Sequence, residues 1–279
     1  MTAVPNIDQP TRPGYLREFG GTGSPVVLVG DILGGYASWS PHAERLTPNW
    51  RVIGVSPLVV LEAAEGRIAP AEWGVPLESA ALEAALNAAG VGRIHLAGWS
   101  LGGTIALDFA LRRPDLIKSL TLIEPPVWWL LRQTGQDSPS LQPAADWFRS
   151  FGDKDITEEG LAGFMVKVGG TEPDVDPRQT RAWRLAWTHR LAIASSWRVI
   201  GHEDDPARLS SLRMPALLVR GTESLARDRL IASTLKEHIP HAALLELLGR
   251  HTSHFEAMDA FLEAFERVMA EAESWHGRH

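Results

Sequence analysis

The chain has 279 residues, of which 44% are hydrophobic and 22% charged, a composition typical of globular proteins that argues against a disordered or fibrous chain. A net charge of −7 without a basic stripe argues against binding to nucleic acid. The sequence contains no cysteine, which excludes disulfide bonds, thiolate nucleophiles and thiolate metal ligands. The N-terminus lacks the apolar run of a secretory signal, and no stretch approaches the ~20 apolar residues of a membrane span. We therefore expect a cytoplasmic protein with no membrane partner.

Short apolar runs alternate with longer stretches of helical spacing. This alternation predicts an α/β fold, a mostly parallel central sheet with helices on both faces. Because parallel strands covered on both faces are apolar throughout, we expect buried strands at 25–29, 51–55, 93–97, 119–123, 215–219 and 243–247. Apolar spacing predicts helices at 77–89, 101–113, 227–238 and 255–272.

Residues 126–210 interrupt that alternation with tryptophans, Gly/Pro turns and helical pieces. We expect a helical cap at 126–210, inserted into a core domain formed by residues 1–125 and 211–279. A single tryptophan here most simply packs the cap onto the core, but as a group we expect some to line an apolar pocket. The candidate pocket residues are Trp99, Trp128, Trp129, Trp183 and Trp187.

The strongest local motif follows the strand expected at 93–97. It reads Gly98-Trp99-Ser100-Leu101-Gly102 and leads into an amphipathic helix, so it matches G-x-S-x-G in the strand–turn–helix context that this motif requires. The glycines permit a tight turn that holds Ser100 in strained geometry at the helix N-terminus. There the amide of Leu101 and the helix dipole can stabilise an oxyanion.

A second motif follows the last expected strand, where the chain reads Gly249-Arg250-His251 and continues to Glu256. Together with the serine turn it resembles the α/β-hydrolase fold superfamily, in its serine hydrolase branch, from residue 13 to about 272. The resemblance implies Ser100 as nucleophile and His251 as general base, with His254 as the competing histidine. Arg250 departs from the glycine that usually precedes the base.

The catalytic acid is open between three carboxylates. Many relatives place it after the penultimate strand, but there this sequence reads Gly221-Thr222-Glu223-Ser224 and has serine at the usual position of the aspartate. Glu124 directly follows the strand at 119–123, where some branches of the family carry the acid. We favour Glu124, with Glu223 and Asp228 as alternatives; any of them would orient the imidazole and stabilise its cationic form.

The resemblance also implies a second oxyanion donor in the loop after the strand at 25–29. By alignment Ile32 supplies that amide beside Leu101. The loop begins Gly30-Asp31 instead of the common His-Gly, and a buried carboxylate facing an oxyanion would oppose it. We therefore expect the Asp31 side chain to turn away.

These features predict a serine hydrolase that cleaves a small, largely apolar ester or lactone through an acyl-enzyme, with no metal and no organic cofactor. Ser100 in place of an aspartate argues against dehalogenase or epoxide-hydrolase chemistry. Two alternatives stay open: a carbon–carbon bond hydrolase acting on a diketone, and a non-catalytic ligand-binding receptor of the same fold. The sequence predicts no particular oligomeric state.

Overall fold

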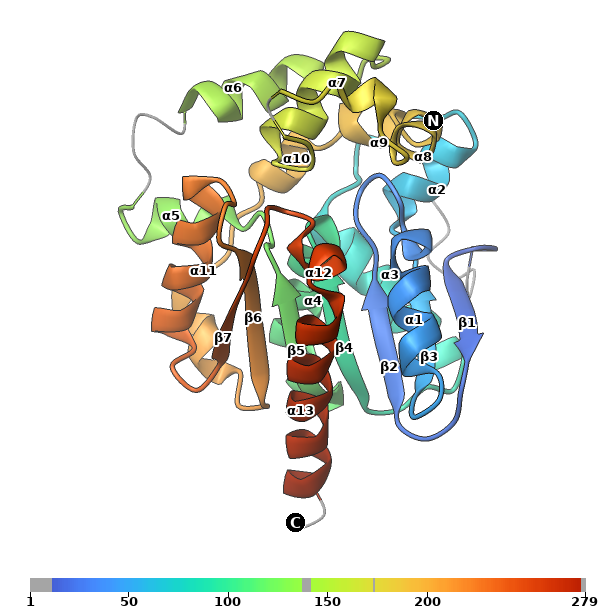
Figure 1. The fold of residues 1–279 in the computed structure, drawn as a ribbon, viewed down its shortest axis with the longest axis vertical. Helices are drawn as coiled ribbons and strands as arrows, with labels where there is room; N and C mark the ends of the chain where they lie inside the picture. Colours follow the sequence, from blue (N-terminus) through green and yellow to red (C-terminus); the bar gives the residue numbers. More distant parts are fainter. Residues whose placement is uncertain (1–11, 137–141, 173, 277–279) are drawn as a thin grey trace.

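A seven-stranded sheet forms the centre of the protein (Figure 1), seen in a computed structural model that describes residues 12–136, 142–172 and 174–276. Its strand order is β1-β3-β2-β4-β5-β6-β7, and only the β1–β3 pair is antiparallel. The strands are β1 (Leu16–Gly20), β2 (Pro25–Val29), β3 (Arg51–Val55), β4 (Ile94–Trp99), β5 (Ile117–Ile123), β6 (Ala216–Gly221) and β7 (Ala243–Leu247). The predicted α/β fold with a mostly parallel sheet is confirmed.

The two edges of the sheet differ from the sequence prediction. All six expected strands are present, but β1 was missed because it is a short edge strand with exposed Arg17 and Glu18 instead of an apolar run. The expectation that 243–247 is buried is wrong for most of β7, where Ala243 is exposed and only Leu247 is buried. As the outermost strand, β7 has a neighbour on one side only.

Helices cover both faces of the sheet. In the core they are α1 (Ser40–Leu46), α2 (Leu58–Ala64), α3 (Val75–Ala88), α4 (Leu101–Arg112), α11 (Ala226–His238), α12 (Ser253–Glu256) and α13 (Met258–His276). Short 3-10 turns lie at η1 (Tyr36–Trp39), η2 (Pro114–Leu116), η3 (Pro177–Gln179) and η4 (Pro206–Ser211). Helices α1 and α2 were not predicted, and the helix expected at 255–272 is divided into α12 and α13.

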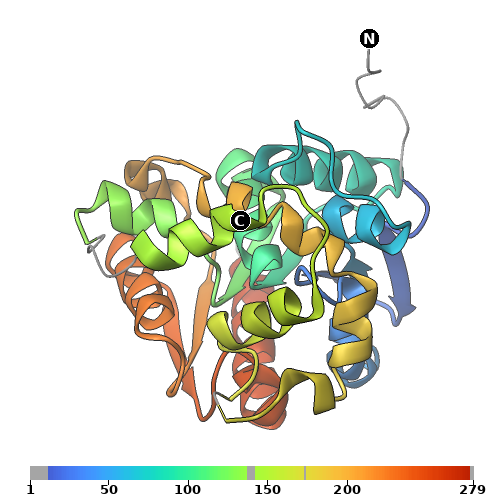
Figure 2. The ribbon, with the colours of Figure 1, turned by 90° about the horizontal axis from the view of Figure 1, so that it is seen from above.

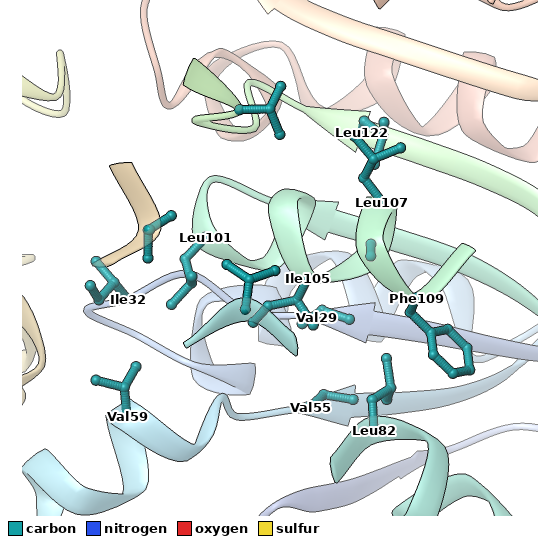
Figure 3. Packing of buried hydrophobic residues seen from close by; sticks show 14 of the residues in the cluster. Val29, Ile32, Val55, Val59, Leu82, Leu101, Ile105, Leu107, Phe109 and Leu122 are labelled. Atoms are coloured by element: carbon teal, nitrogen blue, oxygen red, sulfur yellow. The ribbon is translucent and has the colours of Figure 1, made fainter. Parts of the chain in front are cut away.

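Two buried clusters lie on the two faces because successive strand residues point in opposite directions. In β2, Val27 and Val29 belong to the cluster under α3 and α4, shown in Figure 3 with Leu82, Ile105 and Phe109. Val26 and Leu28 belong to the second cluster, with apolar residues of α1 and α13. Strand β2 is therefore apolar throughout, as expected of a strand covered on both faces.

The segment between β5 and β6 is helical. It contains α5 (Trp128–Gln133), α6 (Gln142–Phe151), α7 (Glu158–Lys167), α8 (Trp183–Thr188), α9 (Leu191–Ala194) and α10 (Trp197–Ile200). Most of these helices lie across one end of the sheet, at the top of Figure 1 and facing the viewer in Figure 2. We call residues 126–210 the cap segment; its status as a separate domain stays a prediction. Among the described residues, no helix combines the length and apolarity needed to cross a membrane.

Candidate active site

Ser100 lies in the sharp turn between β4 and α4. Its backbone has φ 55° and ψ −123°, an uncommon conformation for a residue other than glycine, and its N–H donates to the Ile123 carbonyl at 2.9 Å. The flanking glycines are required by space: a Cβ at Gly98 would lie 2.1 Å from the Gly102 carbonyl oxygen, and one at Gly102 would lie 2.2 Å from the Val29 oxygen. The sequence motif thus forms the strained turn that it predicts.

His251 and Glu124 meet in the protein interior. His251 Nδ1 lies 2.7 Å from Glu124 Oε2, and the two side chains are 8% and 1% exposed. A proton on Nδ1 donates to the carboxylate and leaves Nε2 as the free base, a tautomer inferred from this contact. The geometry therefore pairs the predicted base with one of the three candidate acids.

The electrostatics of the pair favour the charged forms. Burial lowers the pKa of His251, but the Glu124 hydrogen bond and the negative charges of Glu124, Asp228 and Asp31 raise it by more, so it stands above its ordinary value of 6.5. Burial raises the pKa of Glu124, whereas the hydrogen bond and charge of His251, followed by the donors Gly221 and Ser224, lower it below its ordinary value. This environment stabilises an imidazolium, the state that His251 reaches on taking a proton.

The loop after β6 holds the other oxygen of Glu124. Oε1 accepts a hydrogen bond from the Gly221 N–H at 2.7 Å and a short one from the Ser224 hydroxyl. Ser224, the residue at the usual position of the aspartate, is thus a donor to the carboxylate that comes from β5. This role was not predicted from the sequence. The feature that could have indicated it is a serine at the position where the acid is expected.

The two alternative acids lie differently. Glu223 is exposed, and its backbone N–H donates to the Gly249 carbonyl at 2.8 Å. Asp228 is buried, and a carboxylate oxygen lies within 4.8 Å of ligand atoms of Glu124 and His251. Its oxygens are engaged by Arg227, whose Nε lies 2.8 Å from Oδ1. Among the three carboxylates, the hydrogen bond to His251 belongs to Glu124.

His254 lies apart from this pair. It is completely buried, stacks on His42 with ring centroids 5.3 Å apart, and packs against Trp99 at 4.7 Å. Burial, followed by the neighbouring His42 and His251, holds its pKa well below the ordinary value. This neutral, packed ring has the surroundings of a core residue.

The candidate oxyanion residues lie next to Ser100. Ile32 and Leu101, close together at one end of the cluster in Figure 3, line the same cavity as Ser100. The Asp31 carboxylate folds back onto its own loop and accepts hydrogen bonds from Leu33 N at 3.0 Å, Gly34 N at 3.1 Å and the Ser38 hydroxyl. Burial, partly offset by these donors, raises its pKa.

Two cavities open on Ser100 and His251. The small cavity, about 50 Å³, is bounded by Glu124, Leu101 and the apolar ends of the cap helices, and also by Arg227 and Asp228. The large cavity, about 290 Å³, lies between the loop after β2 and the cap segment, and its walls are mostly apolar. Ile32, Phe164 and Val168 line both cavities, so the two spaces adjoin at the serine.

The five candidate pocket tryptophans separate into two groups. Trp99 lines the large cavity and Trp128 the small one. Trp129, Trp183 and Trp187 line neither of these cavities, contrary to expectation. Trp129 is 2% exposed within the main apolar cluster, and Trp183 and Trp187 stack on each other at 6.1 Å beneath the guanidinium groups of Arg178 and Arg190. They pack the cap instead.

Two groups of side chains in the described residues could hold a metal ion. Glu124, Asp228 and His251 form one, and Asp108, His202 and Asp204 the other; within each group the ligand atoms lie within 4.8 Å of one another. In the first, His251 Nδ1 and Glu124 Oε2 are engaged in a hydrogen bond with each other. The expectation that the protein uses no metal stays a prediction.

Comparisons with known proteins identify the fold family of the chain. The sequence model of the α/β hydrolase fold family matches residues 77–258. The chain is 32% identical, over 88% of its length and 91% of the relative, to a protein of Azorhizobium caulinodans that carries the provisional name of a carbamate hydrolase, RutD.

Two esterases are also similar to the chain. The chain is 25% identical to the pimeloyl-[acyl-carrier protein] methyl ester esterase of Nitrosomonas europaea, a match over 58% of this chain and 65%, just under two thirds, of that protein. The esterase EaEST from Exiguobacterium antarcticum has a similar fold, with a TM-score of 0.73 and 18% identity over 93% of this chain and 95% of that one.

Proposed function

Because the chain belongs to the α/β-hydrolase fold family and is a hydrolase, we propose that it is a serine hydrolase in which Ser100, His251 and Glu124 form the catalytic triad. The observation that carries the proposal is the 2.7 Å contact between His251 Nδ1 and Glu124 Oε2. His251 and Ser100, a serine in a strained turn, line the same two cavities. A buried carboxylate that fixes an imidazole next to a nucleophile is the arrangement that acyl transfer needs.

The reaction proceeds in two halves. His251 Nε2 takes the proton of Ser100 as Oγ attacks the substrate carbonyl, and the amides of Ile32 and Leu101 stabilise the oxyanion. The imidazolium then gives its proton to the leaving alcohol, which departs as the acyl-enzyme forms. In the second half His251 takes a proton from water, the hydroxide attacks the ester, and Ser100 recovers its proton as the acid is released.

The substrate we propose is a small, largely apolar ester or lactone. The walls of the large cavity are mostly apolar, with Trp99, Phe164 and Leu185 among them, and burying an unpaired charge there would be costly. The proposed chemistry needs no metal or organic cofactor, because the triad supplies both nucleophile and proton relay.

A substrate panel tests the proposal. We expect purified protein to hydrolyse short p-nitrophenyl esters or lactones, to prefer neutral over dianionic analogues, and to lose turnover by several orders of magnitude on Ser100→Ala with little change in thermal unfolding. Activity on vinylogous diketones alone would favour carbon–carbon bond hydrolysis. Ligand binding without turnover of any panel member would favour a receptor, and near-normal esterase activity in Ser100→Ala would reject the triad.

A further inference from the structure

Polar groups in the walls of the two cavities differ in whether they have partners. In the large cavity, the Asp31 carboxylate accepts three hydrogen bonds, the Ser38 hydroxyl donates to it, and the Thr252 hydroxyl donates to Glu256 at 2.7 Å. These groups are satisfied by the protein itself. The large cavity thus offers few unfulfilled polar contacts to a ligand.

The small cavity has three polar residues with unused hydrogen-bonding groups. Within the described part of the chain, the Ser196 hydroxyl and the Trp128 indole N–H are buried and have no hydrogen-bond partner, and both residues line this cavity. Arg227 donates to Asp228 through Nε at 2.8 Å and Nη2 at 3.2 Å, while Nη1 has no acceptor among the described residues. Since buried polar groups are nearly always paired, the unpartnered Ser196 hydroxyl and Trp128 N–H, in residues that line the same small space as Arg227, indicate a missing polar partner.

Arg227 is held firmly at this wall. Its side chain is 11% exposed, its guanidinium lies over the Trp128 ring at 4.6 Å, and the Asp228 carboxylate fixes one edge of the guanidinium fork. The ion pair neutralises the charge of the arginine, so the site offers N–H donors without a net positive charge. It therefore favours a neutral oxygen acceptor over an anion.

We propose that the small cavity is a subsite that binds a neutral oxygen of the substrate, a carbonyl or hydroxyl group, with Arg227 as donor and Ser196 as a second partner. The inference rests on the proposed function, because it assigns the small cavity to one end of the same substrate whose apolar part occupies the large cavity. A volume of about 50 Å³ admits only a short group at this end. The preferred substrate is thus an apolar ester that carries one oxygen function near the scissile carbonyl.

Two esters of equal heavy-atom count test the subsite by binding. In the Ser100→Ala protein, isothermal titration with methyl 4-oxopentanoate and methyl 4-methylpentanoate compares a ketone oxygen with a methyl group at the same place. We expect the keto ester to bind roughly ten- to a hundredfold more tightly, the effect of a hydrogen bond to a charged donor. Adding Arg227→Met should abolish the preference, and adding Ser196→Ala should reduce it severalfold.

Matched controls separate the subsite from general damage. Arg267→Met changes an exposed arginine of α13, and Ser79→Ala removes another buried unpaired hydroxyl that lies in α3; both should keep the preference. Arg227→Lys retains a cation beside Asp228 but loses the fork, so it should fold like the parent and still lose most of the preference.

The outcomes distinguish this inference from the proposed function. Equal affinity for the two esters in the Ser100→Ala protein, or a preference that survives Arg227→Met and Arg227→Lys, would overturn the subsite. A different result is that the Ser100→Ala protein shows a keto-ester preference that depends on Arg227 while the protein with Ser100 intact hydrolyses neither ester. That result would support the subsite and count against the catalytic triad.

Discussion

The loops that follow β5 and β6 together present the acid to His251, whereas in many relatives one of these loops does so alone. The loop after β5 supplies the Glu124 carboxylate, whereas the loop after β6 supplies only donors, the Gly221 N–H and the Ser224 hydroxyl. Both strands are parallel neighbours, so their ends reach the same edge of the sheet near His251. In this chain the carboxylate beside the imidazole therefore comes from the end of β5, and the loop after β6 holds it in place.

Removing the carboxylate from the β5 loop should cause the largest loss of activity. Glu124→Gln keeps the shape of the side chain but no longer fixes the tautomer or stabilises the imidazolium, so kcat should fall on the order of 10³–10⁴-fold. Glu223→Gln is the matched control in the β6 loop, where the side chain is exposed, and it should change kcat less than about twofold. Steady-state ester hydrolysis measures both; a larger loss at Glu223 would reverse the roles of the two loops.

Moving the carboxylate from the β5 loop to the β6 loop tests whether the second loop can also present the acid. Glu124→Ala should be as inactive as Glu124→Gln, and adding Ser224→Asp should return the acid to the β6 loop beside His251. Because both loops reach the same place, we expect the double variant to regain roughly ten- to a hundredfold in kcat over Glu124→Ala. Absence of any recovery, in a protein whose thermal unfolding matches that of Glu124→Ala, would show that the loop after β6 cannot present an acid.

Removing the Ser224 donor while keeping the Glu124 carboxylate should have a smaller effect on activity. Ser224→Ala removes a hydroxyl hydrogen bond to a buried carboxylate, which should lower the free energy of unfolding by about 1.5–3 kcal/mol. The Gly221 N–H remains, so Glu124 should stay near His251 and kcat should fall only about tenfold. Denaturant unfolding and ester kinetics measure the two effects. Unchanged values for both would mean that Ser224 does not position the acid.

The smallest expected effect is on the pH dependence of kcat/KM. His251 must be neutral to act as a base, and its pKa is raised above 6.5, so kcat/KM should rise with pH through an apparent pKa above that value. Asp228 is one of the charges that raise this pKa, so Asp228→Asn should move the acid limb slightly toward lower pH, with Glu223→Gln as a control that leaves it in place. A shift toward higher pH would contradict the charge arrangement described here.

How far the sequence could predict the molecule depends on whether a feature is local. The strand at 93–97 and the serine turn were predictable because their apolar run and glycine spacing lie within a dozen residues of the chain. Strand β1 and the partly exposed β7 could not be predicted as they are, since an edge strand lacks the continuous apolar pattern of a central one.

The same distinction between local and long-range features applies to the active site. That Glu124 approaches His251 was favoured over two alternatives from its place after a strand, but the donors that hold it come from a loop 97 to 100 residues away. The cavity walls were the least predictable part. Of the five candidate tryptophans, Trp99 and Trp128 line the two cavities and the other three do not, because the packing of short cap helices decides which ring points inward.

Covalent labelling with a fluorophosphonate probe, followed by peptide mapping, tests whether Ser100 is a nucleophile activated by His251. We expect one adduct on Ser100, no labelling of Ser100→Ala, and much slower labelling of Glu124→Gln than of Glu223→Gln. An adduct on another residue, or a folded wild-type protein that resists the probe, would contradict it.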